Sequence, residues 1–251
     1  MKADKDLIKQ WKKEERMPFK GWDFSYIKNR IIEEKPPWNY AKIARQLIRK
    51  SKSVLDMETG GGEIFSSLGP FPKHAIAYEG YKPNVKVARK RLKPLGIKVI
   101  ESRNPKHLPF KDKEFDLILN RHGALDAPEI YRILKEEGIF FTQQVTGSSD
   151  LQDLVKEFKA NRRFSNITLE RYEKEIRRAG LHIIKKRKWK GKMIFKDVGA
   201  IIYYLKAIPW IVPGFSVNKH LKHLIKLHNK IDYGKGLEFE MSRFMILAQK
   251  K

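Results

Sequence analysis

The sequence contains no cysteine, so a disulfide framework, a thiolate nucleophile and a thiolate zinc site are all excluded. It also lacks an apolar run long enough to span a bilayer. The first residues, from Met1 to Arg16, are charged throughout and contain no apolar segment typical of a signal peptide. These absences predict a cytoplasmic protein that does not insert into membranes.

Acidic residues are scarce relative to basic ones. The chain has 29 Asp and Glu against 54 Lys and Arg, which gives a formal net charge of +25. Such an excess favours contact with polyanions, RNA among them. The densest basic group runs from Lys185 to Lys196 around Trp189, whose ring is of a kind that stacks on bases. The alternative is a strand with alternate residues facing solvent, so charge alone leaves RNA binding open.

Strand-like and helix-like patterns alternate from residue 53 onward. At 251 residues and 41% hydrophobic content, one domain with additions is expected. The alternation predicts an α/β fold in which helices cover both faces of a mostly parallel sheet. We expect strands at 53–57, 75–78, 97–100, 115–119, 139–145, 182–189 and 239–247. We expect helices at 83–92, 127–134, 151–158 and 169–179.

Two aromatic-rich segments lie outside this alternation. Residues 1–50 have helical patterns and are expected to form an N-terminal helical cap on the domain at 51–251. Residues 191–236 separate the last two strands by far more than a hairpin needs, which predicts a structured insertion on the substrate side. Either segment could roof a pocket; packing as ordinary core is the alternative.

A glycine cluster follows the first predicted strand. Asp56 lies near the end of that strand, Glu58 follows it, and the chain then continues into Gly60, Gly61 and Gly62. Consecutive glycines let the backbone turn sharply and bring bare N–H groups against a ligand. A strand, a glycine turn and a helix start form the place where an open α/β sheet holds a nucleotide-like cofactor.

Glu79 comes directly after the second predicted strand. A carboxylate there is well placed to accept hydrogen bonds from both hydroxyls of a ribose. A dinucleotide site needs glycines spaced as G-x-G-x-x-G, whereas here they are consecutive and Glu63 follows at the helix start. That acid would repel a pyrophosphate but tolerate a cationic ligand, which disfavours NAD.

In this order the motifs resemble those of class I S-adenosylmethionine-dependent methyltransferases, of the type 11-like kind. Residues 54–63 resemble the cofactor loop, and Glu79 matches the ribose-binding acid. Residues 108–118 resemble the Leu-Pro-Phe and Phe-Asp-Leu-Val stretch around the fourth strand, and residues 132–138 the turn ahead of the fifth. Residues 198–215 resemble the C-terminal part of a bacterial subfamily, which narrows ancestry without indicating a substrate.

The resemblance implies a Rossmann-like sheet of seven strands with an antiparallel last strand. It also implies S-adenosylmethionine as cofactor, bound by Asp56, Glu58, Gly60, Gly61, Gly62, Glu79, Gly80, Asn104 and Asn120. Two positions depart from the family pattern. Glu58 replaces the first glycine of the loop, and Asn104 stands where an adenine-contacting Asp is usual. The side-chain oxygen of Asn104 can still accept a hydrogen bond from the adenine amino group.

Methyl transfer from a sulfonium is an in-line displacement that needs alignment and, for some acceptors, a base. The resemblance places the methyl group opposite the carboxyl end of the fourth strand, where Arg121 and His122 stand. We predict His122 as general base and Arg121 as holder of an anionic substrate. The alternative for His122 is a cap on the strand end. Gln143, Tyr203, Tyr204 and Trp210 are the predicted substrate contacts.

Three functions remain open. The favoured one is methylation of a small molecule in a pocket under the aromatic-rich segments. Methylation of ribosomal or transfer RNA is the alternative, but the chain carries no recognisable RNA-binding module or Asn/Asp-Pro-Pro-aromatic motif. A non-catalytic binder that kept the fold is the third. No metal is expected, since His220, His223 and His228 share a predicted helix without a carboxylate nearby.

Overall fold

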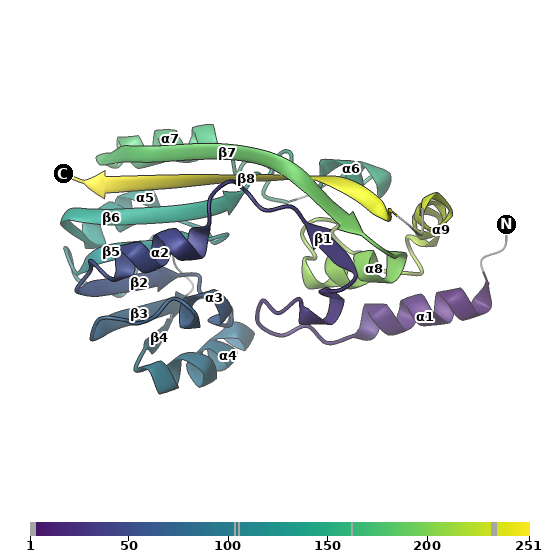
Figure 1. Cartoon of the computed structure of the whole chain (residues 1–251), viewed down its shortest axis with the longest axis horizontal. Coiled ribbons are helices and arrows are strands. Elements are labelled where there is room, and N and C mark those ends of the chain that lie inside the picture. The colour runs from purple at the N-terminus through teal and green to yellow at the C-terminus, as the bar shows by residue number, and fades with distance from the viewer. Residues whose placement is uncertain (1–3, 103, 105, 162, 232–234) are drawn as a thin grey trace.

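One eight-stranded sheet organises the molecule, shown by a computed structural model that describes residues 4–102, 104, 106–161, 163–231 and 235–251 (Figure 1). The strands are β1 (Ile31–Glu33), β2 (Ser53–Met57), β3 (His74–Glu79), β4 (Lys98–Glu101), β5 (Phe115–Arg121), β6 (Leu134–Val145), β7 (Leu181–Phe195) and β8 (Leu237–Lys250). The helices are α1 (Lys5–Arg16), α2 (Tyr40–Ile48), α3 (Glu63–Ser66), α4 (Lys82–Leu92), α5 (Ala127–Ile133), α6 (Gln152–Glu157), α7 (Leu169–Arg178), α8 (Val198–Ala207) and α9 (Leu221–Lys230), with short 3₁₀ turns η1 (Ser25–Ile27) and η2 (Lys93–Leu95). Within the described ranges, no helix has the length and apolarity needed to cross a bilayer.

The strand order is β1-β7-β8-β6-β5-β2-β3-β4. Strands β2 to β6 pair in parallel, and β8 lies antiparallel between β6 and β7. The expected mostly parallel sheet with an antiparallel last strand is therefore confirmed. Because parallel strands need crossover connections, the linking helices lie on the two faces of the sheet.

The sheet has eight strands rather than the seven expected, because β1 adds an antiparallel edge to β7. The expectation that residues 1–50 are helical was wrong at this point. Strand β7 continues to Phe195, paired with β8 as far as Leu237, and so offers unpaired backbone groups at its outer edge. The β-branched side chains of Ile31 and Ile32 favour a strand conformation, which suits pairing with that edge. The insertion between β7 and β8 accordingly begins after Phe195, later than the predicted residue 191.

Three hydrophobic clusters hold the fold together. Helices α2 and α4 pack on one face of the sheet, where Leu117 and Leu119 of β5 point, while α5 and α7 pack on the other face, with Ile118. The third cluster joins α1, α6, α8 and α9 to the overhanging ends of β7 and β8. Figure 1 shows this second lobe beyond the carboxyl ends of the parallel strands. Helix α8 is buried at every residue except Lys206, as expected for a helix that is apolar all round.

Two ion-pair groups tie the lobe to the sheet. The Arg30 guanidinium donates to Asp197 at 2.8 Å and to Glu14 at 2.9 Å, which joins β1 to the start of α8 and to α1. Arg243 on β8 donates to Asp150, and both side chains are buried. Glu33 of β1 lies 3.7 Å from the same guanidinium. A buried ion pair contributes little net stability, because the cost of desolvating both charges offsets their attraction. Removing one partner destabilises the fold strongly, because the other charge then stays buried and uncompensated.

We expect Asp150→Ala to lower the free energy of unfolding by about 3–5 kcal/mol, because Arg243 would stay buried without its main counterion. Urea denaturation measures the change. The matched control is Glu238→Ala, which breaks an ion pair with Lys192 between two half-exposed side chains and should cost under about 1 kcal/mol. Equal small losses in both variants would contradict the account.

Candidate functional site

The loop after β2 is held in place by Glu79 at the end of β3. The buried Glu79 carboxylate accepts hydrogen bonds from the backbone N–H groups of Gly60 and Tyr81, each at 2.7 Å. Gly60 and Gly62 have φ of +64° and +78°, a region that favours glycine. The glycine turn therefore exists because these residues lack a Cβ and because a neighbouring strand end anchors the first of them.

Three carboxyl groups meet at this edge of the sheet. Burial raises the pKa of Asp56 to about 7. Burial, reinforced by the charge of Glu79, also raises the pKa of Glu58 to about 7. The pKa of Glu79 is raised by burial too, although hydrogen bonds from backbone N–H groups oppose the rise. A site with this many desolvated carboxyl groups favours a cationic ligand.

Arg121 and Tyr40 lie beside these acids. The guanidinium of Arg121, at the end of β5, is 5.9 Å from the ring centre of Tyr40, and no carboxylate in the described ranges lies within ion-pair distance of it. Burial lowers its pKa. The Tyr40 hydroxyl is buried without a hydrogen-bond partner among the described residues. An unpaired guanidinium and an unpaired hydroxyl together make a place for a carboxylate.

His122 follows Arg121 in a left-handed conformation, with φ of +62°. The Trp38 indole N–H donates to Oε1 of Gln143 at 2.8 Å, so the Gln143 amide nitrogen faces Nε2 of His122 at 3.3 Å. That nitrogen donates, and Nε2 of His122 is therefore the ring atom without a proton. Burial, with the charges of Arg121 and Arg243, holds the pKa of His122 well below its usual range, so the ring is neutral at pH 7.

The remaining predicted cofactor contacts are placed differently. Asn120 is fully buried and its side-chain oxygen accepts from Thr142 at 3.0 Å and Gln144 at 2.5 Å, which accounts for its burial without a ligand. Gly80 follows Glu79 and is partly buried. Asn104 is exposed after β4, where its side-chain oxygen accepts from the backbone N–H of Lys106 at 3.1 Å.

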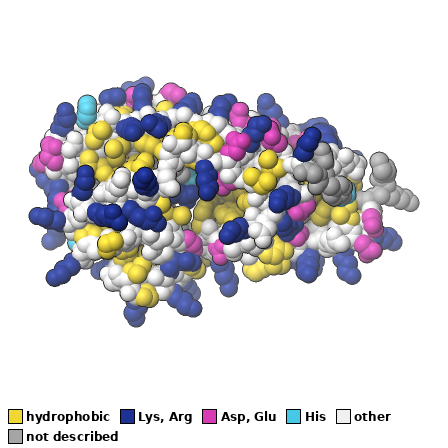
Figure 2. Space-filling view, viewed as in Figure 1, with side chains coloured by type: hydrophobic (Ala, Val, Ile, Leu, Met, Phe, Trp, Pro, Cys, Tyr) yellow, Lys and Arg dark blue, Asp and Glu magenta, His cyan; other side chains and the backbone are white. Residues whose placement is uncertain are grey.

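The predicted substrate contacts differ in their exposure. Tyr203 and Tyr204 are buried in the core of the second lobe. Trp210 is partly exposed, and its ring lies nearly parallel to that of Trp22, with centres 5.9 Å apart. A Cβ on Gly60 would lie 3.7 Å from the Cβ of Trp22, so this aromatic pair adjoins the glycine loop. Figure 2 shows a hollow with a hydrophobic floor between the sheet and the second lobe.

The basic residues of β7 are only partly paired, since Lys185 and Arg187 are exposed and form no ion pair with a described residue. Lys186, Lys188, Lys190 and Lys192 pair with glutamates at 2.5–3.1 Å. Trp189 is half-buried, and its ring covers Gly191. Both features match the alternative of an ordinary strand with solvated side chains. They weaken the argument for RNA binding on this strand.

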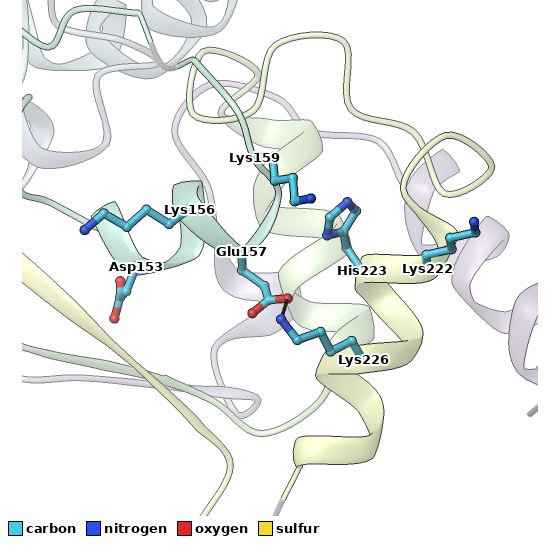
Figure 3. A pocket seen from close by; sticks show the side chains of 7 residues that line it. All are labelled: Asp153, Lys156, Glu157, Lys159, Lys222, His223 and Lys226. Carbon is cyan, nitrogen blue, oxygen red and sulfur yellow. Dashed lines mark ion pairs between the residues drawn. The ribbon is translucent and has the colours of Figure 1, made fainter.

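A separate hollow of about 510 Å³ lies between α6 and α9. Its lining is basic, with Lys226 paired to Glu157 at 2.7 Å and His223 turned toward Lys159 (Figure 3). It lies apart from the strand ends that carry the acids. His220 precedes α9 instead of sharing it with His223, and in the described part of the chain no three acidic or histidine side chains converge as a metal site.

Sequence reasoning missed Tyr40 and Trp38 as site residues. Both lie in the segment that leads into α2, far along the chain from Arg121 and Gln143. The only signal was two aromatic residues after Pro36 and Pro37, and no spacing rule links such residues to a strand end.

A comparison with known protein families finds a match over the part of the chain that forms this edge of the sheet. A family model described as a methyltransferase domain matches residues 55–142, which run from β2 into β6 and include the glycine loop, Glu79 and His122. Residues 55–142 are therefore similar to a methyltransferase domain. A search of curated proteins gives no match.

Solved structures share this fold at low identity. A candidate methyltransferase from Bacillus halodurans C-125 aligns with a TM-score of 0.62 and 17% identity, over 84% of this chain and 98% of its own. Geranyl diphosphate methyltransferase in complex with S-adenosylmethionine aligns at 0.52 and 12%, over 84% of each chain. A [4+2]-cyclase aligns equally well, at 0.52 and 12%, over 84% and 80%. The fold is therefore shared by more than one chemistry.

Gly123, in the loop after β5, leaves room for Glu58, because a Cβ there would overlap the Cβ of Glu58. We expect Gly123→Ala to lower the free energy of unfolding by about 1–3 kcal/mol through overpacking. In a Glu58→Gly background the same change should cost at least about 1 kcal/mol less, because the overlapping side chain is gone. Urea denaturation of the four proteins gives this coupling. Equal costs in both backgrounds would show that the two loops do not press on each other.

Proposed function

We propose that this chain transfers a methyl group from S-adenosylmethionine to a small molecule. The observation that carries the proposal is the anchored loop: Glu79, buried at the end of β3, holds Gly60 by accepting from its backbone N–H. Its carboxylate also faces the Gly80 backbone N–H and the Asn84 side chain, donors that the two vicinal hydroxyls of a ribose would partly replace. The methyltransferase domain match and the structure of a relative in complex with the same cofactor support the assignment.

The amino-acid end of the cofactor fits the groups left unpaired beside the loop. Its carboxylate suits the Arg121 guanidinium and the Tyr40 hydroxyl, both of which lack a hydrogen-bonding partner in the described ranges. Its ammonium suits Asp56, which is buried nearby. We therefore assign Arg121 to the cofactor instead of to an anionic acceptor. When bound, S-adenosylmethionine supplies an electrophilic methyl group.

His122 remains the proposed proton acceptor. Its ring is neutral at pH 7, but the lone pair of its unprotonated atom, Nε2, accepts from the Gln143 amide, so Gln143 has to turn away before Nε2 can take a proton. A neutral imidazole at the end of β5 can take a proton from an acceptor that reacts there. The low pKa limits how strongly it holds that proton, so this role suits an acceptor that is itself easily deprotonated.

A small molecule is favoured over RNA as the acceptor. The Trp22–Trp210 pair, which adjoins Gly60, and the hydrophobic hollow between the sheet and the second lobe (Figure 2) suit a small ligand with apolar surface. Four of the basic residues that favoured RNA, Lys186, Lys188, Lys190 and Lys192, are engaged with glutamates. Because a [4+2]-cyclase has a similar fold, the fold alone does not establish transferase activity, and the titration below also tests the third function, a non-catalytic binder.

The test is calorimetric titration of the chain with S-adenosylmethionine and S-adenosylhomocysteine. We expect dissociation constants of the order of micromolar. Glu79→Gln should weaken binding about ten- to a hundredfold, because charge-assisted hydrogen bonds to the ribose contribute about 1.5–3 kcal/mol. The matched control is Glu101→Gln, which changes the exposed glutamate opposite Glu79 on β4 and should leave binding unchanged.

Absence of binding at millimolar ligand would contradict the proposal and favour the non-catalytic function. Binding without transfer to any metabolite pool, but with transfer to RNA that falls steeply as salt rises, would replace the small-molecule acceptor with RNA.

A further inference from the structure

Glu58 is the residue of the glycine loop whose backbone conformation is least usual for its residue type. It adopts φ of +55°, which is uncommon for a residue with a Cβ. Its side chain packs against Gly123 in the loop after β5, which has no Cβ to obstruct it. A strained backbone conformation and a matching glycine across the site hold this carboxyl group between the loop after β2 and the loop after β5.

The Glu58 carboxyl has no hydrogen-bond or ion-pair partner among the described residues. Its neighbours on β3 are Tyr78 and Glu79, and neither supplies a positive charge. The side chain is only partly exposed, so solvent screens it incompletely. Such a carboxyl either stays protonated or, when ionised, is stabilised by a cation that a ligand supplies.

The charges of the site match the methyl donor better than the product. Asp56, Glu58 and Glu79 provide three carboxyl groups, and Arg121 provides one guanidinium. S-adenosylmethionine brings an ammonium, a sulfonium and a carboxylate. With the ammonium assigned to Asp56 and the carboxylate to Arg121 and Tyr40, the sulfonium is the one ligand charge without a counterpart. Glu58 is the one acid left unpaired.

We propose that Glu58 is a specificity-determining residue that favours the cationic methyl donor over its neutral product, an inference that rests on the proposed function. During transfer the acceptor's lone pair forms the new bond to the methyl carbon, and the electrons of the broken bond stay on sulfur. The sulfur thereby loses its positive charge. The attraction to Glu58 disappears at that step, which favours release of S-adenosylhomocysteine.

The selection depends on pH. Burial raises the pKa of Glu58 to about 7, so below that pH the carboxyl is neutral and the attraction to the sulfonium is lost; above it the attraction is present. The other titratable or charged groups facing this region are Asp56 on β2, Tyr78 and Glu79 on β3, and Arg121 and His122 on β5. Asp56 titrates over the same range but interacts with the ammonium, which both ligands carry. The ratio of the two affinities therefore isolates Glu58.

The experiment measures the dissociation constants of S-adenosylmethionine and S-adenosylhomocysteine by calorimetry at pH 6 and pH 8. In the unmodified chain, the preference for S-adenosylmethionine should rise about tenfold between these pH values, the size expected for one partly screened charge pair. Glu58→Gln keeps the shape and backbone of the residue and should remove this rise. Asp56→Asn is the control: it should weaken both ligands while leaving the rise in their ratio.

The outcomes separate the two proposals. If both ligands bind but the ratio is independent of pH, or rises equally in Glu58→Gln, the role of Glu58 is refuted while the cofactor site stands. If neither ligand binds the unmodified chain at millimolar concentration, both proposals are refuted. If Glu58→Gln lost its fold, Glu58→Gly would serve in its place: it should also remove the rise, and a rise that persisted in it would refute the role of Glu58.

Discussion

The pair of hydrogen bonds from Gly60 and Tyr81 to the Glu79 carboxylate is the constraint on which the candidate site depends. The bond from Gly60 joins the ends of two parallel strands that the sheet register brings together, whereas the bond from Tyr81 is local and orients the carboxylate. They fix the first glycine of the loop, and the positive φ values of Gly60 and Gly62 then decide its path. A backbone hydrogen bond from Thr59 to Tyr78, at 3.0 Å, holds the loop beside Glu58, whose side chain lies against Gly123.

The second lobe depends on the overhang of β7 and β8. These strands continue past the parallel part of the sheet, and α1, α8 and the edge strand β1 pack on the overhanging part (Figure 1). The segment between α1 and β1 then crosses the glycine loop, since a Cβ on Gly21 would overlap the Glu63 carboxylate. Access to this edge of the sheet is therefore shaped by residues that precede the region matched by the methyltransferase model.

The parallel strands, the glycine loop and Glu79 were predictable because each leaves a local pattern in the sequence. These patterns are an apolar run, three consecutive glycines and an acid at a strand end. β1 was not, since three residues carry no periodicity and only the exposed edge of β7 makes them a strand. Tyr203 and Tyr204 were expected near substrate, yet α8 is apolar on every side and is enclosed as core. The contact between Trp38 and Gln143 joins residues 105 positions apart and leaves no signal in the sequence.

The most direct test of the account is a crystal structure of the chain grown with saturating S-adenosylmethionine. The account predicts density along the carboxyl ends of β2, β3 and β5, with the ribose hydroxyls on Glu79 and the ligand carboxylate between Arg121 and Tyr40. Density for the ligand elsewhere on the molecule, or an empty strand edge at saturating ligand, would contradict the central claim that this edge is a methyl-donor site.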